Sequence, residues 1–151
     1  MRATTVTRHI KAPRSALYRA LLDSRAVRTW MVPDGMTSYV HAFDAREGGE
    51  IRISLTYDTP NGRGKTDAGT DTYHGHFVTL VPDSQVVEVV QFETTDPSMQ
   101  GMMTITFVLD DAPGGTNVVA HHDNLPPGIS SADNEKGWKM ALDKLAMLVE
   151  G

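Results

Sequence analysis

The sequence contains no cysteine among its 151 residues. Disulfide bonds and thiolate chemistry, whether catalytic or metal-binding, are therefore excluded. Long apolar runs are also missing, since no stretch approaches the roughly 18 residues that a membrane-spanning helix needs. The first ten residues are too polar for a signal peptide. We therefore expect no membrane span, and we expect the protein to lie in the cytoplasm.

Clustered positive charge is absent as well. The chain has 14 Lys and Arg residues against 19 Asp and Glu, and its net charge is -5. The basic residues are scattered, whereas nucleic-acid binding requires groups of Lys and Arg that displace counterions. We therefore expect no nucleic-acid partner. A composition of 40% hydrophobic and 22% charged residues is ordinary for a globular protein, and the length suits one domain over residues 1–151.

The N-terminal part predicts one strand followed by two short helices. Residues 4–10 alternate between polar and apolar side chains, which is typical of a strand. Pro13 suits the first turn of a helix, and Leu17 and Leu21 continue that helix with an apolar stripe. Asp23 ends it and can cap a second short helix that carries Trp30.

The middle of the chain is rich in strands, and the C-terminal part is helical. From residue 130 onward, Trp138, Leu142 and Leu145 recur at helical spacing. The polar, glycine-rich segment 58–71 predicts a long loop that is close enough to the sheet to act as a gate. Six further strands are expected around residues 39–43, 51–57, 72–81, 85–94, 102–110 and 116–123. The order β-α-α-β-β-β-β-β-β-α with short connections predicts an α+β fold, with the helices on one side of a curved antiparallel sheet.

A series of short motifs resembles the START-like (SRPBCC, helix-grip) superfamily. Within it, the chain is similar to the branch named for the activator of the ninety-kilodalton heat-shock protein ATPase. The motifs run in the expected order over nearly the whole chain, and the series carries more weight than any one of them. They are Ala12-Pro13-Arg14, Ala20-Leu21 with Asp23, Trp30, Phe43-Asp44-x-Arg46-x-Gly48-Gly49, Gly75 before Pro82, Met103-Thr-Ile-Thr-Phe107, Gly115-Thr116, His122 with Leu125-Pro126, and Gly137-Trp138.

The resemblance implies a cup in which a long C-terminal helix closes a cavity lined by a sheet of about six to seven strands. Such relatives bind lipids, sterols, polyketides or plant hormones, and some cyclise or hydrolyse their ligands. The chaperone co-activator carries a separate N-terminal domain, whereas residues 1–10 here already form the first strand. Chaperone activation is therefore the weakest of the functions that the resemblance suggests. A homodimer is a further expectation, because dimerisation is common among relatives.

Several side chains are candidates for the wall of that cavity. The apolar wall would come from aromatic residues, while His41 or His122 would supply a polar anchor for a small hydrophobic or amphipathic ligand. Met36 and Met103 could contribute as well, since methionine adapts to irregular apolar shapes. The alternative for each of these residues is ordinary core packing. The aromatic candidates are Trp30, Tyr39, Phe92, Phe107 and Trp138.

The histidines offer little support for a metal site. His74 and His76 share one face of a strand, a spacing found in some zinc sites. A third ligand would have to come from residues 121–123 on another strand, so two exposed polar histidines are the simpler interpretation. His122 itself shares an inward face with Val118 and Ala120, where it is either a core residue or a contact for a ligand. We expect no metal and no cofactor.

Catalysis finds no recognisable constellation in the sequence. There is no G-x-S-x-G nucleophile elbow, and residues 61–65 lack the spacing of a phosphate-binding loop. Glu88 is the one carboxylate that could lie inside the cup, but valines on both sides leave its orientation open. Ligand binding is therefore the leading hypothesis. An enzyme that uses His122 or Glu88 is the second, and a chaperone co-activator or other interaction module is the third.

Overall fold

The computed structural model describes residues 2–58 and 69–150. Most of the predicted loop 58–71, including the segment 61–65, therefore lies outside the described residues. The strands and helices follow the predicted order, with a short 3-10 helix where only a turn was expected. They are β1 (Ala3–Ile10), α1 (Arg14–Leu21), α2 (Ser24–Trp30), β2 (Met36–Phe43), β3 (Glu50–Tyr57), β4 (Thr70–Val81), β5 (Gln85–Phe92), η1 (Pro97–Met99), β6 (Met103–Ala112), β7 (Gly115–Asp123) and α3 (Ser131–Glu150).

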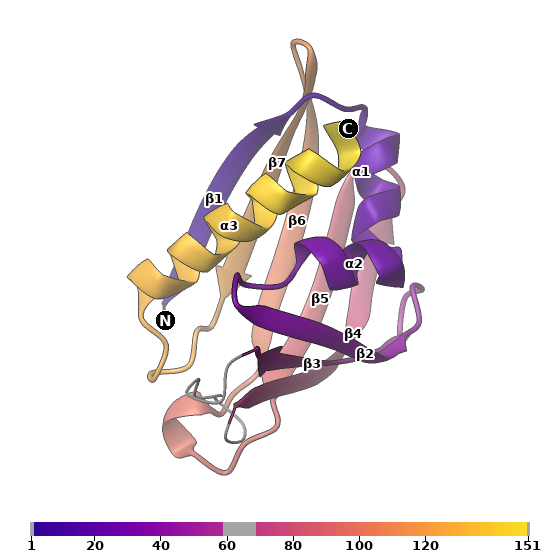
Figure 1. Ribbon diagram of the computed structural model, residues 1–151. Helices are drawn as coiled ribbons and strands as arrows, with labels where there is room; N and C mark the ends of the chain where they lie inside the picture. Colours follow the sequence, from indigo (N-terminus) through magenta and orange to yellow (C-terminus); the bar gives the residue numbers. More distant parts are fainter. Residues whose placement is uncertain (1, 59–68, 151) are drawn as a thin grey trace.

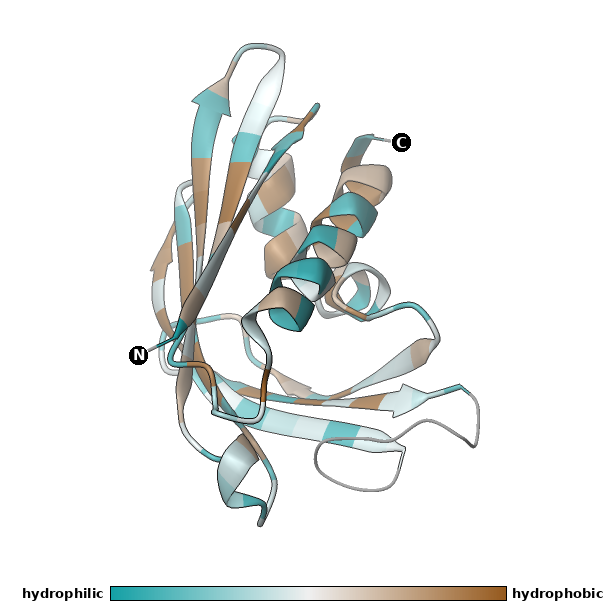
Figure 2. Cartoon of the chain, turned by 90° about the vertical axis from the view of Figure 1, so that its left-hand side faces the viewer, coloured by the Kyte–Doolittle hydropathy of each residue, from teal (hydrophilic) through white to brown (hydrophobic). Residues whose placement is uncertain are grey.

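The described strands form one curved antiparallel sheet of seven strands, in the order β1-β7-β6-β5-β4-β3-β2. All three helices lie on the same side of it, and α3 runs across the concave face beside β1 and α2 (Figure 1). Seen from the side, the strands β2 and β3 curve beneath the helices and close the lower part of the cup (Figure 2). This is the helix-grip fold that the sequence predicts.

Local sequence explains where each helix begins. The Asp23 side chain accepts hydrogen bonds from the backbone N–H groups of Arg25 and Ala26, and it thereby caps α2. The hydroxyl of Ser130 accepts from the N–H of Asp133 at 3.2 Å and caps α3 in the same way. None of the described helices, α3 included, has the length and apolar character needed to cross a membrane.

The pairing of β5 decides the orientation of Glu88. Val86, Glu88 and Val90 are all buried, and Glu88 lies opposite Phe77 on β4 and Ile105 on β6. Residues opposite each other on neighbouring strands face the same side of a sheet. Both of these partners are core residues, so Glu88 points into the cup, which settles the alternative that the sequence left open.

The structure corrects the predicted orientation of Tyr39 and His41 on β2. Val40 pairs with Ile53 and Phe43 pairs with Ile51, although two residues lie between Val40 and Phe43 and only one lies between their partners. This irregularity is a β-bulge, which shifts the alternation of side chains by one residue. Val40 and Phe43 therefore face inward, while Tyr39 is 64% exposed and His41 is exposed beside it.

Gly75 lies on β4 at a place where no side chain fits. A Cβ atom added there would lie 1.8 Å from the carbonyl oxygen of Val89 on the neighbouring strand. The backbones of β4 and β5 can therefore approach each other at this point only with glycine. On the inner face of β4, Gly75 lies between Tyr73 and Phe77.

Candidate functional site

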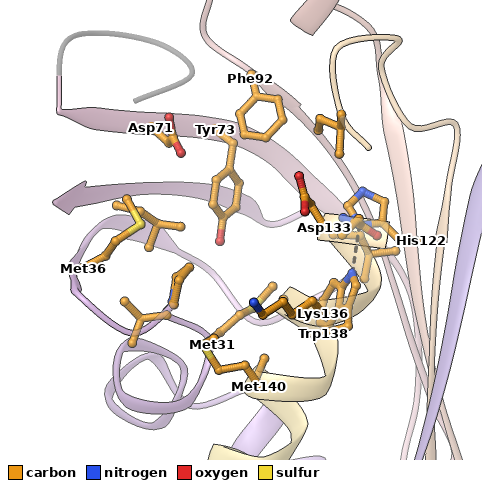
Figure 3. Close-up of a pocket in the computed structure, with 18 of the residues that line it drawn as sticks. Met31, Met36, Asp71, Tyr73, Phe92, His122, Asp133, Lys136, Trp138 and Met140 are labelled. Atoms are coloured by element: carbon orange, nitrogen blue, oxygen red, sulfur yellow. Dashed lines mark hydrogen bonds between the residues drawn. The ribbon is translucent and has the colours of Figure 1, made fainter. Parts of the chain in front are cut away.

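A cavity of about 470 Å³ opens between the first half of α3, the connection 31–36 and the inner face of the sheet. Figure 3 shows the side chains converging on it from these elements. Its volume lies in the range of small-molecule sites in proteins. Most of its wall is apolar, and methionine is prominent in it. Met31, Met36, Met103 and Met140 all contribute, together with Val90, Phe92 and Ile105.

The helix α3 serves two purposes along its length. Its first half, which includes Asn134 and Trp138, lines the cavity. Its second half buries Leu142 and Leu145 completely in the core. The cavity is thus the part of the cup that the helix covers without filling.

His122 is a polar residue of the cavity wall with several neighbours. Its Nδ1 accepts a hydrogen bond from the indole N–H of Trp138 at 3.0 Å, and the side-chain amide nitrogen of Asn134 lies 3.2 Å from the same atom. Thr4 in turn donates to the amide oxygen of Asn134, so that the amide nitrogen faces His122. On the other side of the ring, Nε2 lies 3.1 Å from the sulfur of Met103.

These contacts determine the protonation of His122. An indole N–H can only donate, so Nδ1 must be the unprotonated nitrogen, and the neutral ring carries its proton on Nε2. Burial lowers the pKa of His122 to about 4, against a weaker opposing effect of Asp123. The ring is therefore neutral at physiological pH. Its Nε2–H group is a donor whose only recorded acceptor among the described residues is a thioether, a weak one.

Tyr73 adds a hydroxyl group to the opposite side of the cavity. It lines the cavity from β4, and its phenol ring extends into the space between Met36 and Asp133 (Figure 3). Burial raises the pKa of Tyr73 well above its usual range, and the nearby Glu88 raises it further. The phenol is therefore protonated, and no hydrogen bond of its hydroxyl is recorded with the described residues.

The charged residues of the lining are mainly acidic. Asp34, Asp71 and Asp133 contribute carboxyl groups, and Lys136 contributes an ammonium group. Asp71 is buried, whereas Asp133 and Lys136 are exposed near the opening. Within the described lining, therefore, no cation lies inside the cavity for an anionic ligand to pair with.

A second lysine ties the connection 31–36 to α3. The ammonium group of Lys144 bonds the carbonyl oxygen of Val32 at 2.5 Å and the carboxylate of Asp34 at 2.9 Å. The N–H of Asp34 also points at the sulfur of Met140, 3.2 Å away. One wall of the opening is thus held in place by side chains of the helix.

Of the seven residues that the sequence suggested for the cavity, the structure brings three together in its wall. These are Phe92, His122 and Trp138. Trp30 and Phe107 do not line the cavity, which corrects that expectation. The Trp30 indole donates to the carbonyl of Ala20 at 3.3 Å and packs edge-on against Phe107, so both rings fill the core below the cavity floor.

The two β2 residues lie outside the cup, so their expected place in the wall is also wrong. The rings of Tyr39 and His41 contact each other with centres 4.7 Å apart and planes tilted by 56°. Nε2 of His41 forms a hydrogen bond with the hydroxyl of Ser54 at 2.7 Å, on the outer side of the sheet. Because the bulge of β2 turns both rings outward, neither can contact a ligand in the cavity.

The sequence did not single out Tyr73, Met31 or Met140 for the site. The inward alternation of β4 was a usable signal for Tyr73, since Phe77 shares its face. Met31 and Met140 gave no such signal. Met31 lies just beyond the end of α2, and Met140 is on the partly exposed side of α3.

Glu88 lies deep in the cup but does not line the cavity. Burial raises its pKa to about 7. In the described part of the chain no hydrogen bond to its carboxyl group is recorded. It is thus a buried carboxyl group among apolar neighbours, separated from the space that a ligand would occupy.

His74 and His76 are not assembled into a metal site by the described residues. Nδ1 of His74 lies 3.0 Å from the carboxylate of Glu93, which also holds the Arg52 guanidinium in two hydrogen bonds. Among residues 2–58 and 69–150, no group of three or more potential metal ligands is found. His74 is therefore explained as part of an ion-pair cluster on the outer side of the sheet.

Comparison with known proteins assigns the family. The model of the family "Activator of Hsp90 ATPase homolog 1-like protein" matches residues 11–150. The chain belongs to this family. No curated protein gives a match.

Solved structures share the fold of this chain. Protein CV1439 from Chromobacterium violaceum is 26% identical, with a TM-score of 0.89 and coverage of 99% of this chain and 97% of that one. The AHSA1-like protein from Aeromonas hydrophila is 18% identical, with a TM-score of 0.74 and coverage of 99% of this chain and 92% of that one. Protein MLL2253 from Mesorhizobium loti is 20% identical, with a TM-score of 0.74 and coverage of 99% and 97%. These three solved structures share the fold over nearly their full lengths.

Proposed function

We propose that this family member binds a small, mainly apolar molecule in the cavity between α3 and the sheet. The observation that carries the proposal is the cavity itself, which is apolar over most of its wall and includes the polar side chains of Tyr73 and His122. An apolar cavity with a few placed polar groups is the usual form of a small-molecule site. A site without a ligand role would more simply be filled by larger side chains.

Native mass spectrometry of the gently purified protein tests this proposal. A bound molecule at a ratio of one per chain, released and identified after denaturation, is the expected result. Replacing Met140 by Trp, which would fill part of the cavity, should abolish that adduct. The matched control is Met147→Trp, because Met147 is 77% exposed on the same helix and does not line the cavity. An adduct that survives in the Met140→Trp protein would contradict binding in this cavity.

Acid–base catalysis has weaker support than binding. Glu88 lies outside the cavity wall, and Nδ1 of His122 is engaged by Trp138. The two titratable groups therefore do not flank a common space in which a substrate could sit. Binding without chemical conversion agrees better with this arrangement. A homodimer is the assembly we propose, and the same native spectra report it directly as a doubled mass.

A further inference from the structure

We propose that the cavity selects an uncharged apolar molecule that carries a carbonyl-type oxygen, and that the Nε2–H of His122 donates a hydrogen bond to that oxygen. This inference rests on the proposed function and names the chemical class of its ligand. It follows from three observations, which concern the donor at His122, the hydroxyl of Tyr73 and the charged groups of the cavity wall.

The first observation is that the hydrogen bond from Trp138 makes Nε2 of His122 a donor. The Trp138 indole N–H lies 3.0 Å from Nδ1, so the proton of the neutral ring must be on Nε2. The sulfur of Met103, 3.1 Å away, is a weak acceptor and sits on a flexible side chain. A ligand oxygen would be a much better acceptor, and methionine can move aside to admit it. The Nε2–H of His122 is therefore available to donate a hydrogen bond to a lone pair of a ligand oxygen.

The second observation is that Tyr73 presents a protonated hydroxyl to the same space (Figure 3). The hydroxyl opens onto the cavity, so a ligand that supplies an acceptor there gains a hydrogen bond to it. A carbonyl oxygen has two lone pairs and no proton of its own. It can therefore accept from the wall without adding a donor that would need a partner.

The third observation is that the described lining places no cation inside the cavity for an anion to pair with. Lys136 is exposed near the opening, and of the carboxylates in the lining Asp34 is already paired with Lys144. A carboxylate ligand would therefore lose its hydration against a mostly apolar wall. An ammonium ligand would be attracted by the carboxylates, but it has no lone pair to offer His122. An uncharged acceptor is the one head group that suits all of these residues.

Three probes of equal chain length separate these head groups. Methyl nonyl ketone, undecanoate and undecylammonium share eleven carbons and differ in charge and hydrogen bonding. Binding to the full chain is measured near neutral pH by native mass spectrometry and by the fluorescence of Trp138, which lines the cavity. The ketone should bind most tightly. Tighter binding of undecanoate or undecylammonium, or equal binding of all three, would overturn the inference while leaving a ligand site in place. Failure of all three to bind would overturn the proposed function with it.

The role of His122 is tested by a matched pair of variants. His122→Phe keeps an aromatic ring and removes the donor, so the ketone should bind roughly tenfold more weakly. His121→Phe is the control, because His121 is the next residue on β7 and its Nδ1 bonds Thr5 on the other face of the sheet. An equal loss in both variants, or in neither, would contradict a donor role for His122.

The His122→Phe protein also leaves the Trp138 indole without its acceptor and could fold poorly. The wild-type protein provides a second measurement that needs no variant. Nitrogen-15 NMR of its imidazole side chains should show His122 with the proton on Nε2, and adding the ketone should shift that N–H resonance. A proton on Nδ1, or an Nε2–H signal that stays unchanged at saturating ketone, would overturn the proposal.

Discussion

The indole nitrogen of Trp138 lies 3.0 Å from Nδ1 of His122, and this contact sets the chemistry of the cavity wall. Because the indole can only donate, the imidazole must accept on that side and present N–H on the other. The two residues come from α3 and β7, so the same hydrogen bond also joins the closing helix to the sheet. Positioning of the helix and the choice of tautomer are therefore linked.

Removing that hydrogen bond should cost stability. Trp138→Phe keeps most of the buried ring but leaves Nδ1 of His122 without this donor, at an expected cost of about 1 kcal/mol in the free energy of unfolding. Trp138→Ala removes the ring itself and should cost about 3–5 kcal/mol. Urea unfolding followed by circular dichroism measures both values. The Trp138 ring packs edge-on against Phe107 and His122, with ring centres 5.5 and 5.9 Å away. If Trp138→Ala remains as stable as the wild type, this packing does not contribute as expected.

Replacing Glu88 should make stability less dependent on pH. Burial raises the pKa of this carboxyl group from 4.5 to about 7. The folded state therefore binds this proton more tightly than the unfolded state does. The cost to stability of ionising the buried carboxyl group is absent below about pH 4.5, grows up to about pH 7 and is then constant. Glu88→Gln should therefore stabilise the protein by up to about 3 kcal/mol at about pH 8 and by nothing near pH 4. A gain of equal size at both pH values would contradict this account.

Glu93 should show the opposite dependence on pH. Its bonds to Arg52, and then to His74, lower the pKa of this carboxyl group from 4.5 to about 2. The resulting stabilisation is complete above about pH 4.5 and is lost as the pH falls towards 2. The cluster is partly exposed to solvent, so Glu93→Gln should cost only about 0.5–1 kcal/mol at neutral pH. Urea unfolding at several pH values measures this, and a cost that persists in strong acid would exclude the ion pairs as its source.

Lys144→Met should loosen the connection 31–36. The variant loses the hydrogen bond to the Val32 carbonyl and the ion pair with Asp34. Amide hydrogen exchange in residues 32–36 should accelerate by roughly two- to tenfold, as expected for losing one charged, partly exposed hydrogen bond. Lys139→Met is the matched control, since the partner of Lys139 among the described residues is Glu135, on the exposed side of α3. Equal acceleration in both variants would mean that Lys144 does not secure this segment.

The order of helices and strands was predictable because each boundary has a local cause. Pro13 and Asp23 mark the starts of the first two helices, and the alternation of Ile51 and Ile53 marks a half-buried strand. These signals act over a few residues and need no knowledge of the rest of the fold. The same is true of the inward face of β7, where His122 was placed correctly on the inner side.

Side-chain orientation was harder to predict where it depends on pairing between strands. Glu88 is flanked by valines on both faces, and only its partners Phe77 and Ile105 decide that it points inward. On β2, one extra residue in the bulge turns Tyr39 and His41 outward, and nothing in the local alternation reveals it. The cavity wall itself depends on elements distant in sequence, so Met31 and Met140 could not be assigned to it from spacing alone.

The division of α3 into a cavity half and a core half has a consequence for how this family can change. Substitutions at Met140 or Lys136 alter what a ligand meets while leaving the anchoring residues Leu142 and Leu145 untouched. Ligand selectivity can therefore change at these cavity positions without removing the side chains that anchor α3 in the core. A library randomised at Lys136, Gly137 and Met140 should diversify the molecules that its members accept. With Trp138, Leu142 and Leu145 kept constant, most members should retain cooperative folding.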